Sequence, residues 1–258
     1  MRKNTLLALL SMAALGVPAY AHSAGKPTVV LVHGAFADAS SWNGVVAKLE
    51  KDGYPVVAVA NPLRSVPGDA DYVRRIVDGL NTNVVLVGHS YGGAVITQAA
   101  AGTKSVKSLV YVSAFAPDAG ESAFDLTGKF PGSTLPPTLA TPVALENNGK
   151  DLYIDQAKFP EQFAADVPRS EAKLMAATQR PVTQAALEDK TKAVAWKEIP
   201  SWFIYGDADK NIPPKAIGWM AERAHSKETV VVKGASHVVM VSHPDKVAKI
   251  IEDAATSK

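Results

Sequence analysis

Six short runs of apolar, mostly β-branched residues are spread along this chain of 258 residues. Each run is continuously apolar rather than alternating, which is typical of a strand buried on both faces of a parallel sheet. Amphipathic, helix-compatible stretches lie between them, and strands that alternate with helices predict a doubly wound α/β fold with a mostly parallel sheet. The predicted strands cover residues 28–32, 56–59, 84–87, 109–112, 202–205 and 229–232, and the predicted helices cover residues 41–51, 70–80, 93–101 and 244–254.

This alternation stops between about residues 116 and 196. Prolines are dense over residues 117–142, and no strand-like run is visible. We interpret the segment as a helical lid inserted into a single domain of residues 22–258. The helix-compatible parts of the segment are residues 152–157, 161–165, 170–178 and 183–191. Its apolar side chains could line a substrate pocket or form the core of the lid. The candidates are Phe124, Leu126, Phe130, Leu135, Leu152, Phe159, Phe163, Leu174 and Met175.

Composition excludes several classes of partner and of chemistry. The formal net charge is only +2 and no dense run of Lys and Arg occurs, so a nucleic-acid partner is not expected. The chain has no cysteine, which excludes disulfides, thiolate nucleophiles and Cys-bound metals. The histidines and carboxylates show no metal-ligand spacing. A small-molecule ligand is the partner that remains, and composition does not indicate an oligomeric state.

The first 21 residues have the features of a signal peptide. Arg2 and Lys3 give a positive start, and the apolar run from residue 5 to 17 is too short to span a bilayer. Ala19, Tyr20 and Ala21 then form a small-x-small cleavage site, with Ala24 as a second possible position. We therefore expect a periplasmic or secreted bacterial protein, cleaved after Ala21, without a stable membrane anchor.

The most informative motif is Gly-x-Ser-x-Gly at residues 88–92. It follows a predicted strand and precedes a predicted helix, which is the context of a nucleophile elbow. Gly88 and Gly92 allow the strand and the helix to approach closely, and Ser90 lies at the helix N-terminus, where negative charge is favoured. The alternative is an ordinary strand-to-helix turn. We predict that Ser90 is a nucleophile.

A serine hydroxyl needs a base and an orienting carboxylate, which follow the nucleophile elbow in the order Asp, His. Two late strands end in suitable residues, and the carboxyl ends of parallel strands meet at one edge of a sheet. Asp209 is favoured as the carboxylate over Asp207, which is interpreted as a turn residue. His237, directly after the last strand, is predicted to be the base. His33 and His89 are expected to shape the site, His243 to flank a helix, and His22 and His225 carry no signal.

Two backbone N–H groups are expected to stabilise an oxyanion. Tyr91, the residue after the proposed nucleophile, supplies one of them. The loop after the first strand, which begins with His33 and Gly34, should supply the other. Ala35 is the first choice for this donor and Phe36 is the second. The alternative is that Gly34 only turns the chain.

With these motifs in place, the chain resembles the α/β-hydrolase superfamily over essentially its whole mature length. Leu31 to Phe36 together with Ser41 and Trp42 resemble more narrowly the plant methylesterase and hydroxynitrile lyase branch and its bacterial esterase relatives. The resemblance implies a reaction without a cofactor and, in the esterases, an acyl-enzyme. It also supports the roles given to Asp209, His237 and the amides of Ala35 and Tyr91.

The chain departs from the lyases of that branch at two positions. The lyases need a Thr in the oxyanion loop and a Lys directly after the catalytic His, where this chain has Gly34 and Val238. Without that Lys, no cation beside the base stabilises departing cyanide. We therefore expect a carboxylesterase acting on small or medium esters. The alternatives are a lactonase, amidase, perhydrolase or lyase with the same triad, or a non-catalytic ligand-binding protein of the same fold.

Overall fold

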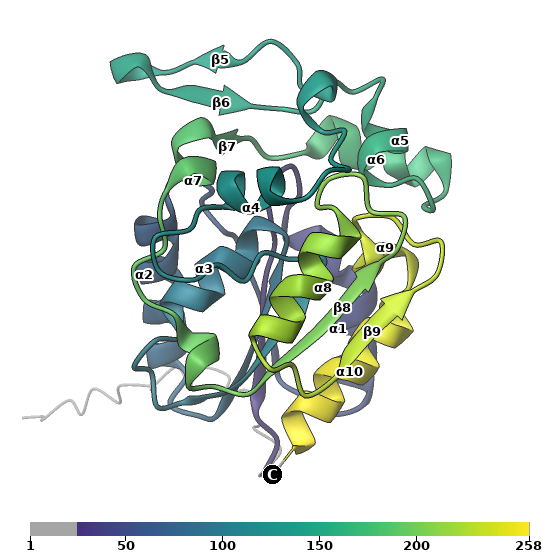
Figure 1. Cartoon of the computed structure of the whole chain (residues 1–258). Coiled ribbons are helices and arrows are strands. Elements are labelled where there is room, and N and C mark those ends of the chain that lie inside the picture. The colour runs from purple at the N-terminus through teal and green to yellow at the C-terminus, as the bar shows by residue number, and fades with distance from the viewer. Residues whose placement is uncertain (1–24, 258) are drawn as a thin grey trace, which may run out of the picture.

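A computed structural model describes residues 25–257 of the chain (Figure 1). The predicted signal peptide and its cleavage positions lie outside the described residues. Within them, no helix is both long and apolar enough to cross a membrane.

The centre of the molecule is a parallel sheet of six strands in the order β2-β1-β3-β4-β8-β9. Strands β1 and β3 lie inside the sheet and are buried along their whole length. Strands β2 and β9 form its two edges and are partly exposed. The predicted fold class is confirmed. The strands are β1 (Thr28–Val32), β2 (Val56–Val59), β3 (Val84–His89), β4 (Val106–Val112), β8 (Ser201–Gly206) and β9 (Thr229–Val232).

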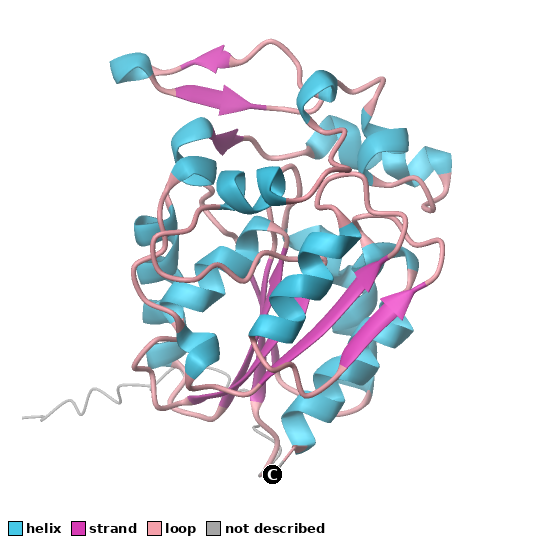
Figure 2. Ribbon diagram, in the orientation of Figure 1, coloured by secondary structure: helices cyan, strands magenta, loops and turns pink. Residues whose placement is uncertain are grey.

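Helices cover both faces of this sheet (Figure 2). The chain runs outward from β1 to β2 and then reverses to β3, so right-handed crossovers place α1 on one face and α2, α3 and α8 on the other. Accordingly α2 packs on α3 on one face, and α10 packs on α1 on the other. The bounds are α1 (Asn43–Lys51), α2 (Val66–Gly79), α3 (Tyr91–Ala99), α8 (Pro214–Arg223), α9 (Val239–Ser242) and α10 (Pro244–Thr256), with a 3-10 turn, η1 (Ala39–Trp42), before α1.

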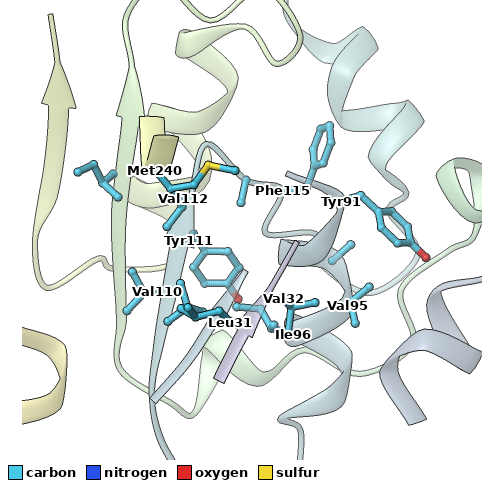
Figure 3. Packing of buried hydrophobic residues seen from close by; sticks show 14 of the residues in the cluster. Leu31, Val32, Tyr91, Val95, Ile96, Val110, Tyr111, Val112, Phe115 and Met240 are labelled. Carbon is cyan, nitrogen blue, oxygen red and sulfur yellow. The ribbon is translucent and has the colours of Figure 1, made fainter. Parts of the chain in front are cut away.

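The core lies between the sheet and these helices. Figure 3 shows Leu31 of β1, Ile96 of α3 and Tyr111 of β4 packed among other apolar side chains. The Tyr111 ring stacks on Phe203 at 4.6 Å, and its hydroxyl pairs with Thr97 at 2.8 Å. Burial of these groups fixes the sheet rigidly beneath the loops at its carboxyl edge.

We call residues 113–200, between β4 and β8, the insertion. Most of it forms a layer above that edge, and its last part descends from α7 along α3 to the start of β8 (Figure 1). The insertion contains a small antiparallel sheet in the order β5-β6-β7 as well as helices. Its elements are α4 (Ala123–Lys129), η2 (Pro136–Thr138), β5 (Val143–Ala144), η3 (Glu146–Asn148), β6 (Lys150–Leu152), α5 (Phe159–Phe163), α6 (Arg169–Thr178), β7 (Val182–Thr183), α7 (Gln184–Glu188) and η4 (Ala195–Lys197).

The expectation that this segment has no strands and has a helix over residues 152–157 was wrong. Leu152 ends β6, and Ile154 forms an extended bridge with Leu139. The Gln179 side chain accepts a hydrogen bond from the Ile154 amide at 2.9 Å and donates one to its carbonyl at 2.8 Å. Because a distant side chain satisfies this backbone, the extended form prevails over the local helical tendency.

Candidate active site

Ser90 lies in the tight turn between β3 and α3. Its backbone has φ 53° and ψ −123°, a strained conformation for a residue with a side chain. The Ser90 amide donates to the carbonyl of Val112 at 3.3 Å, and the Ser90 carbonyl accepts from Gly93 at 2.9 Å and Phe115 at 3.2 Å. These main-chain contacts to α3 and to the end of β4 hold the strained turn in place.

The glycines around Ser90 are required by close backbone contacts. A Cβ atom at Gly88 would lie 2.6 Å from the Gly92 carbonyl oxygen, and one at Gly92 would lie 2.5 Å from that of Val32. Real Cβ atoms do not approach other atoms so closely. Both positions therefore exclude a side chain, as the motif predicts.

The structure places the Asp209 carboxylate, and not that of Asp207, against the imidazole of His237. The Nδ1 atom of His237 donates to Oδ2 of Asp209 at 2.7 Å, and both side chains are buried. The other oxygen of Asp209 accepts from the amides of Asn211 at 2.8 Å and Ile212 at 3.0 Å. Asp207 is exposed and accepts from the Gly234 amide. The pair fixes both the tautomer and the orientation of the His237 ring.

His89 brings the segment that carries His237 next to Ser90. The fully buried His89 ring lies 4.8 Å from the His237 ring, and its Nε2 donates to the His237 carbonyl at 3.2 Å. Burial, and secondly the proximity of His237, hold the pKa of His89 well below its usual value, so this ring is neutral. Among residues 25–257, Ser90 Oγ has no hydrogen-bond partner, and catalytic hydrogen bonds often tighten only when substrate binds.

The turn after β1 lies directly against Ser90. A Cβ atom at Gly34 would be 2.6 Å from the Ser90 Cβ atom. The amide of Phe36 donates to the carbonyl of Arg180 at 3.1 Å. The amides of Ala35 and Tyr91, by contrast, have no acceptor within residues 25–257. The amides of Ala35 and Tyr91 are therefore free to donate to an oxyanion, whereas that of Phe36 is not.

A model of the alpha/beta hydrolase family matches residues 29–250. The chain belongs to the alpha/beta hydrolase family. The alpha/beta hydrolase nvfD of Aspergillus novofumigatus is 28% identical over 251 residues, which cover 89% of this chain and 97% of that protein. The alpha-hydroxynitrile lyase of Arabidopsis thaliana is 24% identical over 252 residues, covering 90% and 98%. The crystal structure of polyneuridine aldehyde esterase aligns with a TM-score of 0.76 at 23% identity, over 88% of this chain and 98% of that one.

These comparisons confirm the predicted resemblance to the branch that contains plant esterases and hydroxynitrile lyases. They support the conclusion that this chain is a hydrolase. In the part of this alpha/beta hydrolase that the structure describes, no group of three or more His, Asp and Glu side chains could hold a metal ion.

A second buried histidine of the hydrolase, His33, supports the turn after β1. Its Nε2 accepts from the Asn61 amide at 3.1 Å, so Nδ1 carries the proton and donates to the Gly34 carbonyl at 3.0 Å. Burial lowers the pKa of His33 to about 4. A neutral His33 therefore links the loop after β2 to the turn that contains Ala35.

The insertion covers the site with Phe163, which the sequence offered only as one of several pocket or core candidates, and with Gln162, which it did not single out. Phe163 of α5 packs its ring 5.0 Å from that of His237. Gln162, its neighbour, donates to Asn211 Oδ1 at 2.8 Å and so ties α5 to the loop of Asp209. The sequence contains no local signal for these contacts, because they join segments about 50 to 75 residues apart. Ser90 is 7% exposed and His237 is 1% exposed beneath this cover.

Proposed function

We propose that this hydrolase is a serine carboxylesterase that cleaves small or medium carboxylic esters through an acyl-enzyme on Ser90. The observation that carries the proposal is the buried Asp209–His237 pair beside a strained serine at a helix N-terminus. In this role Asp209 orients the imidazole, His237 is the general base, and the amides of Ala35 and Tyr91 form the oxyanion hole.

The reaction starts when Nε2 of His237 removes the Ser90 proton and Oγ attacks the ester carbonyl carbon. The negative charge that develops on the carbonyl oxygen is stabilised by the two amides and by the N-terminus of α3. The imidazolium is stabilised by Asp209. It then protonates the departing alcohol as the carbon–oxygen bond breaks. Water, activated by His237, releases the acid and restores Ser90.

Cyanohydrin cleavage is disfavoured by two features of the site. The space for a side chain at position 34 is filled by Ser90, so this turn cannot accept the Thr of the lyases without a rearrangement. Val238, at the position of the lyase Lys, is apolar and fully buried. The residue directly after His237 therefore supplies no cation to stabilise a cyanide leaving group.

Export is part of the proposal. The positive start at Arg2 and Lys3, the short apolar run and the site at Ala21 support secretion or a periplasmic location. N-terminal sequencing of the protein recovered outside the cytoplasm tests this. A mature protein that begins at Met1 contradicts it.

The decisive experiment replaces Ser90 with Ala. Hydrolysis of p-nitrophenyl acetate should fall roughly 10⁴-fold or more in kcat, and labelling by a fluorophosphonate should be lost. Ser113 provides a matched control, because it also follows a strand of the sheet, is buried and has a positive φ of 43°. The Ser113→Ala variant should be labelled and remain active. Undiminished hydrolysis by Ser90→Ala would refute the proposed function.

A further inference from the structure

The buried position of the catalytic groups raises the question of where the alcohol half of an ester lies. For the acyl-enzyme to form, the leaving oxygen has to receive its proton from His237, so the alcohol departs past the His237 ring. That ring is covered by Phe163 at 5.0 Å, and Phe163 packs edge-on against Phe36 at 6.2 Å. The alcohol therefore has to lie on the side of the site that these two phenyl rings close.

A cavity of about 260 Å³ begins at Phe36. One wall comes from the chain after β1 and from Val241 of α9, four residues beyond His237, and the other comes from α6 of the insertion. Neither Ser90 nor His237 lines it. Phe36 lines the cavity and packs on Phe163, and Phe163 packs on His237, so these two rings lie between the cavity and the base.

Phe36 has an unusual backbone for an aromatic residue. Its φ is 59°, in the left-handed region that is strained for a bulky side chain. The strained residue is held by the hydrogen bond from its amide to Arg180 and by the packing of its ring on Phe163. The strained Phe36 therefore forms the partition between the cavity and the reacting groups.

The lining of the cavity mixes apolar and polar side chains, and both of its charged residues are acidic. Leu174, which is 69% exposed, and Met175 supply apolar surface. Asp38 and Glu171 are the charged residues that line the cavity, and no basic residue does. Asp38 caps η1 by accepting from the Ser40 amide. Glu171 makes no hydrogen bond or ion pair with any residue between 25 and 257, so its charge is available to a ligand.

We propose that this cavity is the subsite for the alcohol half of the ester. It would favour an apolar alcohol that is cationic or neutral over one that is anionic, with Phe36 setting the size that can pass. This inference rests on the proposed esterase function. An apolar wall beside an unpaired carboxylate recognises such a group, because the alkyl part is buried while the carboxylate attracts positive charge.

Charge preference is tested with two acetate esters of nearly the same shape. Acetylcholine and 3,3-dimethylbutyl acetate share the acetyl group and differ by one positive charge in the alcohol. The ratio of their kcat/KM values should fall about three- to tenfold in Glu171→Lys, in the range of partly exposed charge pairs. Glu50→Lys, an exposed glutamate of α1 outside the cavity, is the matched control and should leave the ratio unchanged.

Size preference is tested at the partition. In Phe36→Leu, kcat/KM for benzyl acetate relative to ethyl acetate should rise about tenfold. A series of p-nitrophenyl esters with longer acyl chains should keep its wild-type order. Glu171 is exposed, so Glu171→Lys remains a fair test even when a variant of the strained Phe36 does not fold.

The inference is overturned if the ratio of kcat/KM for acetylcholine to that for 3,3-dimethylbutyl acetate is unchanged in Glu171→Lys. It is also overturned if Glu50→Lys changes this ratio as much as Glu171→Lys does. It is also overturned when the acyl series, and not the alcohol series, responds to Phe36→Leu. Failure of the esterase proposal looks different, because Ser90→Ala would then hydrolyse these esters as well as the wild-type protein does.

Discussion

The central sheet and the insertion are built in different ways. In the sheet, β1 and β3 are continuous apolar strands buried on both faces, and the chemistry at their ends is positioned by packing. In the insertion, the strands have two or three residues. Its backbone is held by side chains such as Gln179 from the insertion itself and Arg64 from the loop after β2. The insertion also buries apolar side chains such as Ile154, Phe159 and Val182, but its short strands rely on these side-chain hydrogen bonds more than the long strands of the sheet do.

This difference assigns the chemical step to the sheet and the choice of substrate to the insertion. Ser90, Asp209 and His237 follow strands β3, β8 and β9 of the sheet, where small displacements are resisted. The residues over the site and along the proposed alcohol cavity come partly from α5 and α6 of the insertion. We expect changes in the sheet loops to alter the rate of chemistry and changes in the insertion to alter which ester is accepted.

The largest effect on the sheet side is expected at Asp209. Asp209→Asn should lower kcat roughly 10³- to 10⁴-fold, because the amide no longer orients the His237 tautomer or stabilises its positive charge. Ester hydrolysis under saturating substrate measures this. Asp207→Asn is the matched control in the same loop and should stay within a few-fold of wild type. Equal losses of kcat in both variants would mean that the intact loop, and not the carboxylate beside His237, determines the rate.

The next effect concerns stability and His33. Because its folded pKa is about 4, below the usual 6.5, the unfolded chain binds a proton that the folded chain does not. Stability should therefore fall as pH decreases from about 6.5 to about 4, by about 2 kcal/mol between pH 7 and pH 5 from this group. Urea unfolding at both values measures it.

The His33→Gln variant isolates this contribution. Its loss of stability between pH 7 and pH 5 should be smaller than that of the wild type by about 2 kcal/mol, whatever its stability at pH 7. His225→Gln, which removes an exposed histidine, should retain the wild-type pH dependence. An unchanged pH dependence in His33→Gln would show that this histidine is protonated in the folded protein.

The effect expected in the insertion is local rather than global. Gln179→Leu leaves the buried amide and carbonyl of Ile154 without partners, which costs about 2 kcal/mol. Hydrogen exchange at the Ile154 amide should then accelerate about thirtyfold, while β3 remains protected. Gln156→Leu is the control, since Gln156 is exposed and two residues from Ile154. Equal acceleration in β3 would show that the insertion and the sheet unfold together.

The sequence predicted the sheet well because burial on both faces leaves a strong local signal. Three strands have the predicted bounds, and the others extend by one to three residues. Helix α2 begins at Val66 rather than at residue 70, because Ser65 caps it and Pro67 fits the first turn. Helix α8, which begins at the second of the two prolines Pro213 and Pro214, was not predicted.

Less of the site could be predicted. Motif order and strand ends selected Asp209 over Asp207, and Asp209 is the one that contacts His237. The roles of Ala35 and Tyr91 stay predictions. The choice of Ala35 over Phe36 as an available amide depends on the carbonyl of Arg180, which lies 144 residues away along the chain. The contact of Phe163 with His237 is equally long-range. Such pairings leave no periodic or spacing signal, because they are set by how the insertion folds back over the sheet.

The hydrogen bond from Phe36 to Arg180 has a mechanical consequence. It joins the main chain of the insertion to the residue that follows Ala35, so lifting this part of the insertion pulls on the very turn that would bind the oxyanion. A bulky substrate that displaces this part of the insertion would also displace the turn whose amide would stabilise the oxyanion. Acceptance of bulkier substrates is therefore expected to lower the rate of the chemical step, because one peptide group links the insertion to the oxyanion turn.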